Sequence, residues 1–147
     1  MKVHKANLNL HKKIYKKTYK AYITCPATCS QAKLPLLPII KTIIKEKGIE
    51  PFVFHIGTNS KEIFKRDMHL VKSCQLIVAE VSEPSHGVGI ELGVGYCMGH
   101  SLILLHEKGK KISRLAKGLP NAIILEYKNI EDLKKKLNSA LEKLKTN

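Results

Sequence analysis

The sequence contains no tryptophan and only three phenylalanines. So few aromatic rings argue against a surface that binds nucleic acid by stacking its bases. The chain also lacks a run of about 18 apolar residues, so no membrane-spanning helix is expected. Its first apolar cluster is short and flanked by lysines, which is unlike a signal peptide. Glycine and proline are too few for a fibrous or low-complexity chain.

Metal-ligand spacing is absent as well. The four cysteines, at positions 25, 29, 74 and 97, match neither a zinc ribbon nor a C-x-x-C redox pair. Cys74 and Cys97 lie in apolar stretches and are predicted to pack as small hydrophobic side chains. The seven histidines show no ligand spacing, so neither a metal nor a cofactor is expected. Without a secretion signal, reduced thiols predict a cytoplasmic protein.

Acidic residues are scarce beside basic ones, and the net charge is +14. Residues 1–20 hold seven lysines and no acid. We expect residues 1–19 to be a basic arm, disordered or a solvated extension, and residues 20–147 to form one domain. The excess positive charge indicates anionic partners, among which a nucleotide is favoured over nucleic acid.

Strand-like and helix-like segments alternate from residue 20 onward. The predicted strands are 22–25, 52–56, 75–81, 102–105 and 122–125, and the predicted helices are 36–47, 60–73 (capped by Ser60), 88–98 and a last one from about residue 130. This last helix carries an apolar stripe, formed by Ile130, Leu133, Leu137, Leu141 and Leu144.

Such alternation implies an α/β fold. We expect a five-stranded parallel sheet flanked by helices, a flavodoxin-like or Rossmann-like three-layer sandwich. Ligands of these folds bind beyond the carboxyl ends of the strands. The segments 25–33, 82–91 and 106–117 are therefore the places to look for a site.

Two carboxylates stand where apolar residues are expected. Asp67 lies four residues from both Ile63 and Val71, so it shares their buried helix face unless it rolls to the edge and meets a lysine. Glu91 is the only charged residue of the apolar and glycine-rich segment 88–98, which predicts a buried carboxyl with a raised pKa. The alternative is that Glu91 caps the helix at its third position.

Small residues and hydrogen-bond donors surround Glu91 in the sequence. Gly87 and Gly89 remove side chains, so a ligand or the sheet can approach closely. Ser85 and the backbone amides that open the helix predict an anion site. Ser113 lies among basic residues in a neighbouring loop. These features together predict an acid pair beside a phosphate-sized basic pocket.

The segment 78–93, with the sequence VAEVSEPSHGVGIELG, resembles the signature of the 2'-deoxynucleoside 5'-phosphate N-hydrolases. This family is part of the nucleoside 2-deoxyribosyltransferase superfamily, and the likeness extends over residues 20–127, including 22–24 and 63–67. The resemblance implies an N-glycosidase that cleaves (2'-deoxy)nucleoside 5'-monophosphates to free base and (deoxy)ribose 5-phosphate.

The resemblance also implies roles for individual residues. Glu91 matches the nucleophile that attacks C1' of the sugar. Asp67 assists departure of the base or holds the sugar, and Tyr22 hydrogen-bonds near the nucleophile and crowds the 2' position. Ser85, where the transferases carry an aspartate, suits a phosphate. Ser113 resembles a phosphate-binding serine that comes from the neighbouring subunit, which implies a homodimer.

The loop after the first strand departs from the family. The residues CPATCS at 25–30 replace a Gly-Ser-Ile-Arg-Gly-Gly-like segment. Pro26 is similar to the Gly-Pro of the transferases, and Thr28, Ser30 or Lys33 is a candidate replacement for the lost arginine. The predicted substrate-binding set is Ser85, Ser113, Gly87, Gly89, Thr24, Pro26 and Thr28. The alternatives are a base-exchanging nucleoside 2-deoxyribosyltransferase and a non-catalytic nucleotide-binding module.

Overall fold

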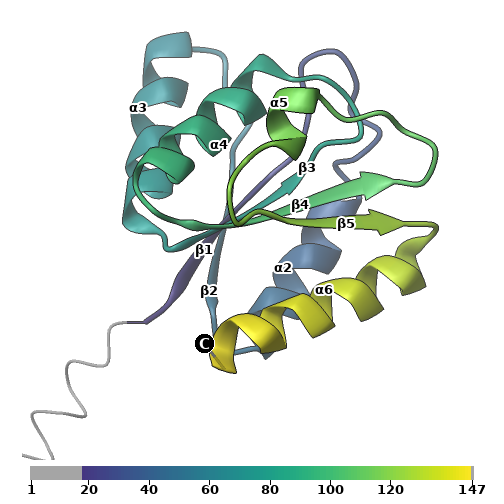
Figure 1. The fold of residues 1–147 in the computed structure, drawn as a ribbon. Coiled ribbons are helices and arrows are strands. Elements are labelled where there is room, and N and C mark those ends of the chain that lie inside the picture. Colours follow the sequence, from purple (N-terminus) through teal and green to yellow (C-terminus); the bar gives the residue numbers. More distant parts are fainter. Residues whose placement is uncertain (1–17, 147) are drawn as a thin grey trace, which may run out of the picture.

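The fold is built on one sheet of five parallel strands. A computed structural model describes residues 18–146, so the prediction for the basic arm lies almost wholly outside the described residues. The strands are β1 (Lys20–Thr24), β2 (Glu50–Val53), β3 (Leu76–Glu80), β4 (Ser101–Glu107) and β5 (Ile123–Tyr127). They pair in the order β2-β1-β3-β4-β5 (Figure 1). The predicted flavodoxin-like α/β class is confirmed.

Helices cover both faces of this sheet. They are α2 (Leu36–Glu46), α3 (Ser60–Ser73), α4 (His86–Cys97), α5 (Arg114–Lys117) and α6 (Ile130–Thr146). Helices α2 and α6 pack on one face, and α3 and α4 on the other (Figure 1). Parallel strands need crossover connections, and the helices in these connections give the three layers.

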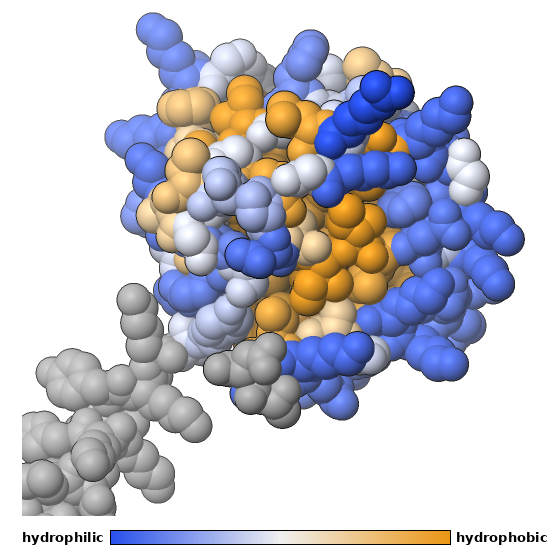
Figure 2. All heavy atoms as spheres, viewed as in Figure 1, coloured by the Kyte–Doolittle hydropathy of each residue, from blue (hydrophilic) through white to orange (hydrophobic). Residues whose placement is uncertain are grey.

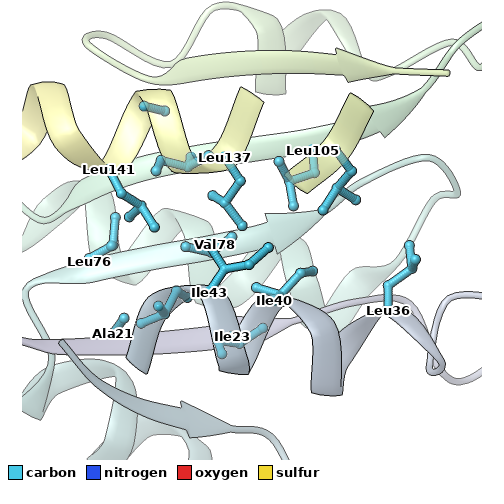
Figure 3. Close-up of a cluster of buried hydrophobic side chains, with 14 of the residues drawn as sticks. Ala21, Ile23, Leu36, Ile40, Ile43, Leu76, Val78, Leu105, Leu137 and Leu141 are labelled. Carbon is cyan, nitrogen blue, oxygen red and sulfur yellow. The ribbon is translucent and has the colours of Figure 1, made fainter. Parts of the chain in front are cut away.

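The central strand β3 shows why the sequence folds this way. All five of its residues are buried, as a continuous apolar run predicts for a strand covered on both faces. Its side chains alternate, so Leu76 and Val78 face α2 and α6, whereas Ile77 and Ala79 face α3 and α4. Figure 3 shows the first of these cores, in which side chains of α2, α6 and the strands gather around Val78.

Two helix starts differ from the prediction. Asn59, and not Ser60, caps α3, because its side chain accepts hydrogen bonds from the backbone N–H groups of Lys61 and Glu62 at 3.0 and 3.1 Å. The buried stripe of α6 begins at Leu133, because Ile130 opens the helix and is 44% exposed.

Helix α4 is less buried than its apolar composition predicts. A helix that lies on a sheet contacts it along one side only, so its outer side chains stay accessible. Ile90, Tyr96 and the following Met98 are each about half exposed. Cys97 is exposed too, so the prediction that it packs in the core is wrong, whereas Cys74 is buried as expected.

The carboxyl ends of the five strands meet at one edge of the sheet. The loops that follow β1, β3 and β4 leave from this edge, as parallel order requires. Within residues 18–146, no helix combines the length and the apolar content needed to cross a bilayer.

Candidate active site

Glu91 is a buried carboxyl on α4 with only one of its oxygens hydrogen-bonded. The residue is 7% exposed, and the Tyr22 phenol donates to its Oε1 at 2.8 Å. In the part of the chain that the structure describes, its Oε2 is the one buried side-chain nitrogen or oxygen without a hydrogen-bond partner. An unpaired buried acceptor costs free energy, so Oε2 is a candidate for contact with a ligand.

The surroundings of Glu91 change its acidity. Burial raises the pKa of this carboxyl from 4.5 to about 6. The hydroxyls of Thr24 and Tyr22 oppose the shift by stabilising the charge, while the negative charge of Asp67 adds to it. The carboxylate is therefore mostly ionised at neutral pH, as a nucleophile must be, and its perturbed pKa is typical of functional sites.

The start of α4 decides where Glu91 lies. Ser85 caps the helix, and its Oγ accepts a hydrogen bond from the Val88 backbone N–H at 3.4 Å. Glu91 is the sixth residue of the helix, so the alternative of a capping role at the third position is wrong. Gly87 lies one turn earlier on the same side, and both residues line one pocket.

Asp67 of α3 meets Glu91 in this pocket, which has a volume of about 220 Å³. Asp67 is 6% exposed and accepts a hydrogen bond from the Arg66 Nε at 2.9 Å, so an edge position beside a lysine is ruled out. Arg66 also donates to the backbone carbonyl of His55, which ties α3 to the loop before it. The remaining lining residues are Ser60, Ile63, Phe64, Met68, Gly87 and Ile90.

The end of β1 supplies two hydroxyls to the site. Tyr22 is fully buried, and burial, followed by the charge of Glu91, raises the pKa of its phenol, so it remains a donor. Thr24 is 2% exposed and lies two residues further along the strand, so it faces the same side of the sheet. Tyr22 therefore lies beside Glu91, as the resemblance implies, and Thr24, which was predicted only as a substrate-binding residue, lies on the same side of the sheet.

Ser85 and Ser113 line a second, larger cleft. This cleft has a volume of about 550 Å³ and lies between α4 and α5, and Gly89 lines it as well. Ser113 caps the short α5 by accepting a hydrogen bond from the Leu115 backbone N–H at 3.2 Å. Figure 2, which has the view of Figure 1, shows apolar side chains exposed in the middle of the molecule, below the part where α4 and α5 lie, inside a border of hydrophilic residues. A single chain thus places the two serines on one side of α4 and the acid pair on the other.

Three residues that were predicted to contact the substrate line neither the acid pocket nor the larger cleft. Pro26 is buried and Thr28 is exposed, and neither lines the acid pocket or the larger cleft. Lys33 forms an ion pair with Glu107, with Nζ 2.6 Å from Oε2, so it is not free to replace the lost arginine. Sequence patterns did not point to Arg66 as the partner of Asp67, although the two residues are adjacent in the chain.

This arrangement suits attack on a sugar carbon. A carboxylate with an unpartnered oxygen and a second carboxyl line one pocket, and a buried phenol donates a hydrogen bond to the first carboxylate. Glycoside cleavage uses such a pair, in which one carboxylate attacks and the other assists. Among the residues described, no three histidine, cysteine, aspartate or glutamate side chains gather as metal ligands.

Comparisons with known proteins identify relatives, although no family model matches the chain. A Thermofilum pendens protein named "Putative 2'-deoxynucleoside 5'-phosphate N-hydrolase 1" is 27% identical over 135 residues, which cover 83% of this chain and 94% of that protein. The 5-hydroxymethyl-dUMP N-hydrolase of Rattus norvegicus is 27% identical over 77 residues, which cover 51% of this chain and 47% of that protein.

Solved structures show the same fold. A CMP N-glycosidase of Clostridium botulinum has a TM-score of 0.68 at 23% identity, with 82% of this chain and 98% of that chain covered. A 2-deoxyribosyltransferase of Bacillus psychrosaccharolyticus has a TM-score of 0.61 at 16% identity, with 83% and 95% covered. The relatives thus confirm that this chain resembles proteins named 2'-deoxynucleoside 5'-phosphate N-hydrolase, and the solved structures show that its fold is that of a CMP N-glycosidase and of a 2-deoxyribosyltransferase.

Proposed function

We propose that the protein hydrolyses the N-glycosidic bond of (2'-deoxy)nucleoside 5'-monophosphates, giving free base and (deoxy)ribose 5-phosphate. The observation that carries this proposal is the buried Glu91, whose Oε2 has no hydrogen-bond donor and whose pocket contains the second carboxyl, that of Asp67. Relatives named for this reaction support it. We assign the reaction to the cytoplasm, where the four free cysteines would stay reduced.

Glu91 is the nucleophile in this proposal. Its carboxylate oxygen bonds to C1' while the bond from C1' to the base nitrogen breaks, and that electron pair leaves with the base, which takes up a proton. Water then attacks C1', the ester bond to Glu91 breaks, and the carboxylate is restored. Asp67 assists departure of the base or holds the sugar, while the Tyr22 phenol keeps Glu91 in place. Two displacements at C1' retain its configuration.

The 5'-phosphate is assigned to the start of α4. Ser85 lies there with the first backbone N–H groups of a twelve-residue helix, where the helix dipole favours an anion. An aspartate in place of Ser85 would repel the phosphate, so the serine favours monophosphates over free nucleosides. Gly87 and Gly89 leave room for the ligand beside these amides.

We further propose a homodimer in which Ser113 completes the site of the neighbouring subunit. Leu115 of α5 is 85% exposed, and Ile90 and Tyr96 of α4 are about half exposed, so these two helices present apolar area that a second copy would cover. Ser113 of one chain lines the larger cleft together with Ser85, and neither serine lines the acid pocket of its own chain. The resemblance implies that the second phosphate-binding serine comes from the neighbouring subunit, and Ser113 is the residue that matches it.

Sedimentation tests the dimer. Leu115→Lys should convert a dimer to monomers and raise KM, because a charge at the centre of an apolar contact is costly to bury. Lys135→Glu, an exposed change on α6, is the matched control and should leave the mass unchanged. A wild-type protein that sediments as a monomer at micromolar concentration would contradict the dimer.

The second candidate is a nucleoside 2-deoxyribosyltransferase that exchanges bases between free deoxynucleosides. Pro26, which is similar to the Gly-Pro of the transferases, favours it, and Ser85 opposes it. The two reactions differ in whether water or a second base resolves the glycosyl-enzyme intermediate. A transferase would act on nucleosides that lack the 5'-phosphate.

Chromatography of the products separates these functions. The protein would be incubated with a panel of 5'-monophosphates and the matching free nucleosides, with and without an acceptor base. Base released from the monophosphates alone is the expected result. Base exchange on free nucleosides would instead support the transferase, and no release from any substrate would support a non-catalytic nucleotide-binding module.

A further inference from the structure

A second buried glutamate, Glu80, has no part in the proposed reaction. It lies at the end of β3 and is 0% exposed. Its Oε2 accepts a hydrogen bond from the Ser82 backbone N–H at 3.2 Å. Its Oε1 accepts two, from the Ser82 hydroxyl and from the Tyr127 phenol, the latter at 2.9 Å. Three donors satisfy this carboxylate, as a buried charge requires.

The contacts of Glu80 are part of a closed circuit of five residues. The Ser82 Oγ accepts a hydrogen bond from the Glu107 backbone N–H at 2.7 Å. The Glu107 carboxylate lies 2.6 Å from the Lys33 Nζ, and this Nζ lies 5.9 Å from the centre of the Tyr127 ring, within cation–π range. Tyr127 returns to Glu80, so the five residues form one circuit, which we call the Glu80 ring.

Three groups of the Glu80 ring, Lys33, Glu107 and Tyr127, keep their hydrogen-bonding states at neutral pH. Burial works to lower the pKa of Lys33, but its hydrogen bond to Glu107 and the nearby negative charges raise it overall. The hydrogen bond and charge of Lys33 lower the pKa of Glu107. Burial, followed by the charge of Glu80, raises the pKa of Tyr127 to about 12, so the phenol remains a donor. The ring is therefore intact in the pH range where the proposed nucleophile is ionised.

The Glu80 ring joins two loops at the carboxyl edge of the sheet, and one of them, the loop between β3 and α4, lines the larger cleft. Lys33 belongs to the loop between β1 and α2, which follows Tyr22 and Thr24. Ser82 belongs to the loop between β3 and α4, which leads to the helix cap Ser85. Burial, followed by the charges of Glu80 and Glu91, raises the pKa of the Cys25 thiol to about 12.

We propose that Glu80 is a positioning residue that sets the spacing of these two loops through Ser82, Tyr127 and Lys33, and so determines how tightly the site holds its substrate. This inference rests on the proposed function. It does not place Glu80 in contact with the substrate. The ring acts on binding, so its loss should raise KM and leave kcat nearly unchanged.

Steady-state kinetics of two conservative variants test whether KM rises while kcat stays unchanged. Tyr127→Phe removes one donor from Glu80, and Lys33→Met removes the charge from the ring while keeping the chain length. Each should raise KM for a nucleoside 5'-monophosphate by about 3- to 10-fold, the worth of one hydrogen bond, with kcat within about twofold. Lys47→Met is the matched control, because the Lys47 Nζ also lies 2.6 Å from a glutamate oxygen, that of Glu142, on the surface. An unchanged KM in both variants would overturn the proposal.

Amide hydrogen exchange tests the coupling of the two loops without any substrate. Its outcome is therefore independent of the proposed reaction. Lys33→Met should speed amide exchange in both loops, 26–35 and 81–85, although the substitution lies in only one of them. Lys47→Met should change neither. If exchange rises only in the loop that contains residue 33, or in neither loop, the ring does not couple them and the inference is wrong, whether or not the wild type hydrolyses nucleotides.

Discussion

Two glutamates are buried to nearly the same extent, yet their surroundings are opposite. Glu80, 0% exposed, accepts three hydrogen bonds, whereas Glu91, 7% exposed, accepts one from Tyr22 and leaves Oε2 unpartnered. The fold follows the rule for buried charges at Glu80 and breaks it at Glu91. A local violation that costs stability is expected where a ligand completes the contacts, so the comparison separates a structural carboxylate from a reactive one.

The two carboxylates also lie on different faces of the sheet. Glu80 follows Leu76 and Val78 on the side covered by α2 and α6, with Tyr127 as its neighbour. Glu91 lies on the side covered by α3 and α4, where it lines the pocket with Asp67. Burial alone therefore does not distinguish them, and the supply of donors does.

Replacing Glu91 should have the largest effect on the reaction. Glu91→Gln should lower base release by at least about 10³-fold at saturating monophosphate, because an amide does not attack C1'. Binding of the monophosphate, measured by calorimetry, should persist. Glu142→Gln, an exposed change on α6, is the control and should keep full activity. Turnover by Glu91→Gln within tenfold of the wild type would contradict a nucleophilic role.

Replacing Asp67 should have the next largest effect. Asp67→Asn keeps the shape of the side chain but removes its charge and its proton chemistry, so kcat should fall by about 10²-fold. Asp132→Asn is a matched control, since Asp132 accepts from Lys136 at the same 2.9 Å as Asp67 accepts from Arg66. Equal activity of the two variants would remove Asp67 from the mechanism.

Replacing Tyr22 should raise the pKa of Glu91 without abolishing the reaction. The pKa of Glu91 is about 6, so the rate of the wild type should rise with pH through this value as the carboxylate forms. Tyr22→Phe removes the hydrogen bond that favours the charged form, so this limb of the pH profile should move to higher pH. One hydrogen bond moves the limb far enough to lower the rate by about 2- to 5-fold at pH 6 and by less than twofold at pH 7. An unmoved limb would show that another group sets it.

The same substitution at the two glutamates should change stability in opposite directions. Burial raises the pKa of Glu91 from 4.5 to about 6, so the folded protein loses stability as the pH rises through this range and the buried charge forms. The free energy of unfolding of Glu91→Gln should therefore be about 1–2 kcal/mol higher than that of the wild type above pH 7. Below pH 4 the two proteins should be equally stable.

Glu80→Gln should instead destabilise the fold by about 1–3 kcal/mol at neutral pH, because its amide NH₂ would face one of the present donors. Urea unfolding at pH 4 and pH 8 measures both variants. Destabilisation by Glu91→Gln at pH 8 would mean that hidden donors satisfy its carboxylate, and the contrast with Glu80 would fail.

Much of the architecture could be predicted from local sequence patterns. The strand predicted over 75–81 and the helix predicted over 36–47, which ends just before Gly48 with its φ of +73°, were correct because an apolar run and a helix stop are local signals. The burial of Asp67 and Glu91 followed from helical spacing for the same reason. The cap of α3 was placed one residue late, because Asn59 and Ser60 are both good capping residues and only the backbone distinguishes them.

Contacts between distant segments could not be read from the sequence. Glu80 and its donor Tyr127 are 47 positions apart, and Lys33 and Glu107 are 74 apart, so no periodicity links them. The separation of Ser113 from the acid pocket depends on where α5 packs. The exposure of Ile90 and Tyr96 could not be predicted from composition. An apolar helix has the same sequence pattern whether all of its sides are buried or only the side that lies on the sheet.

Mass spectrometry of the protein quenched in acid during turnover tests the central claim most directly, because a retaining reaction passes through a sugar bound to the nucleophile. With a 2'-deoxynucleoside 5'-monophosphate, the account predicts a deoxyribose-phosphate adduct on the peptide that contains Glu91 and no adduct in Glu91→Gln. An adduct on a peptide without Glu91, or turnover with no adduct on any peptide, would contradict it.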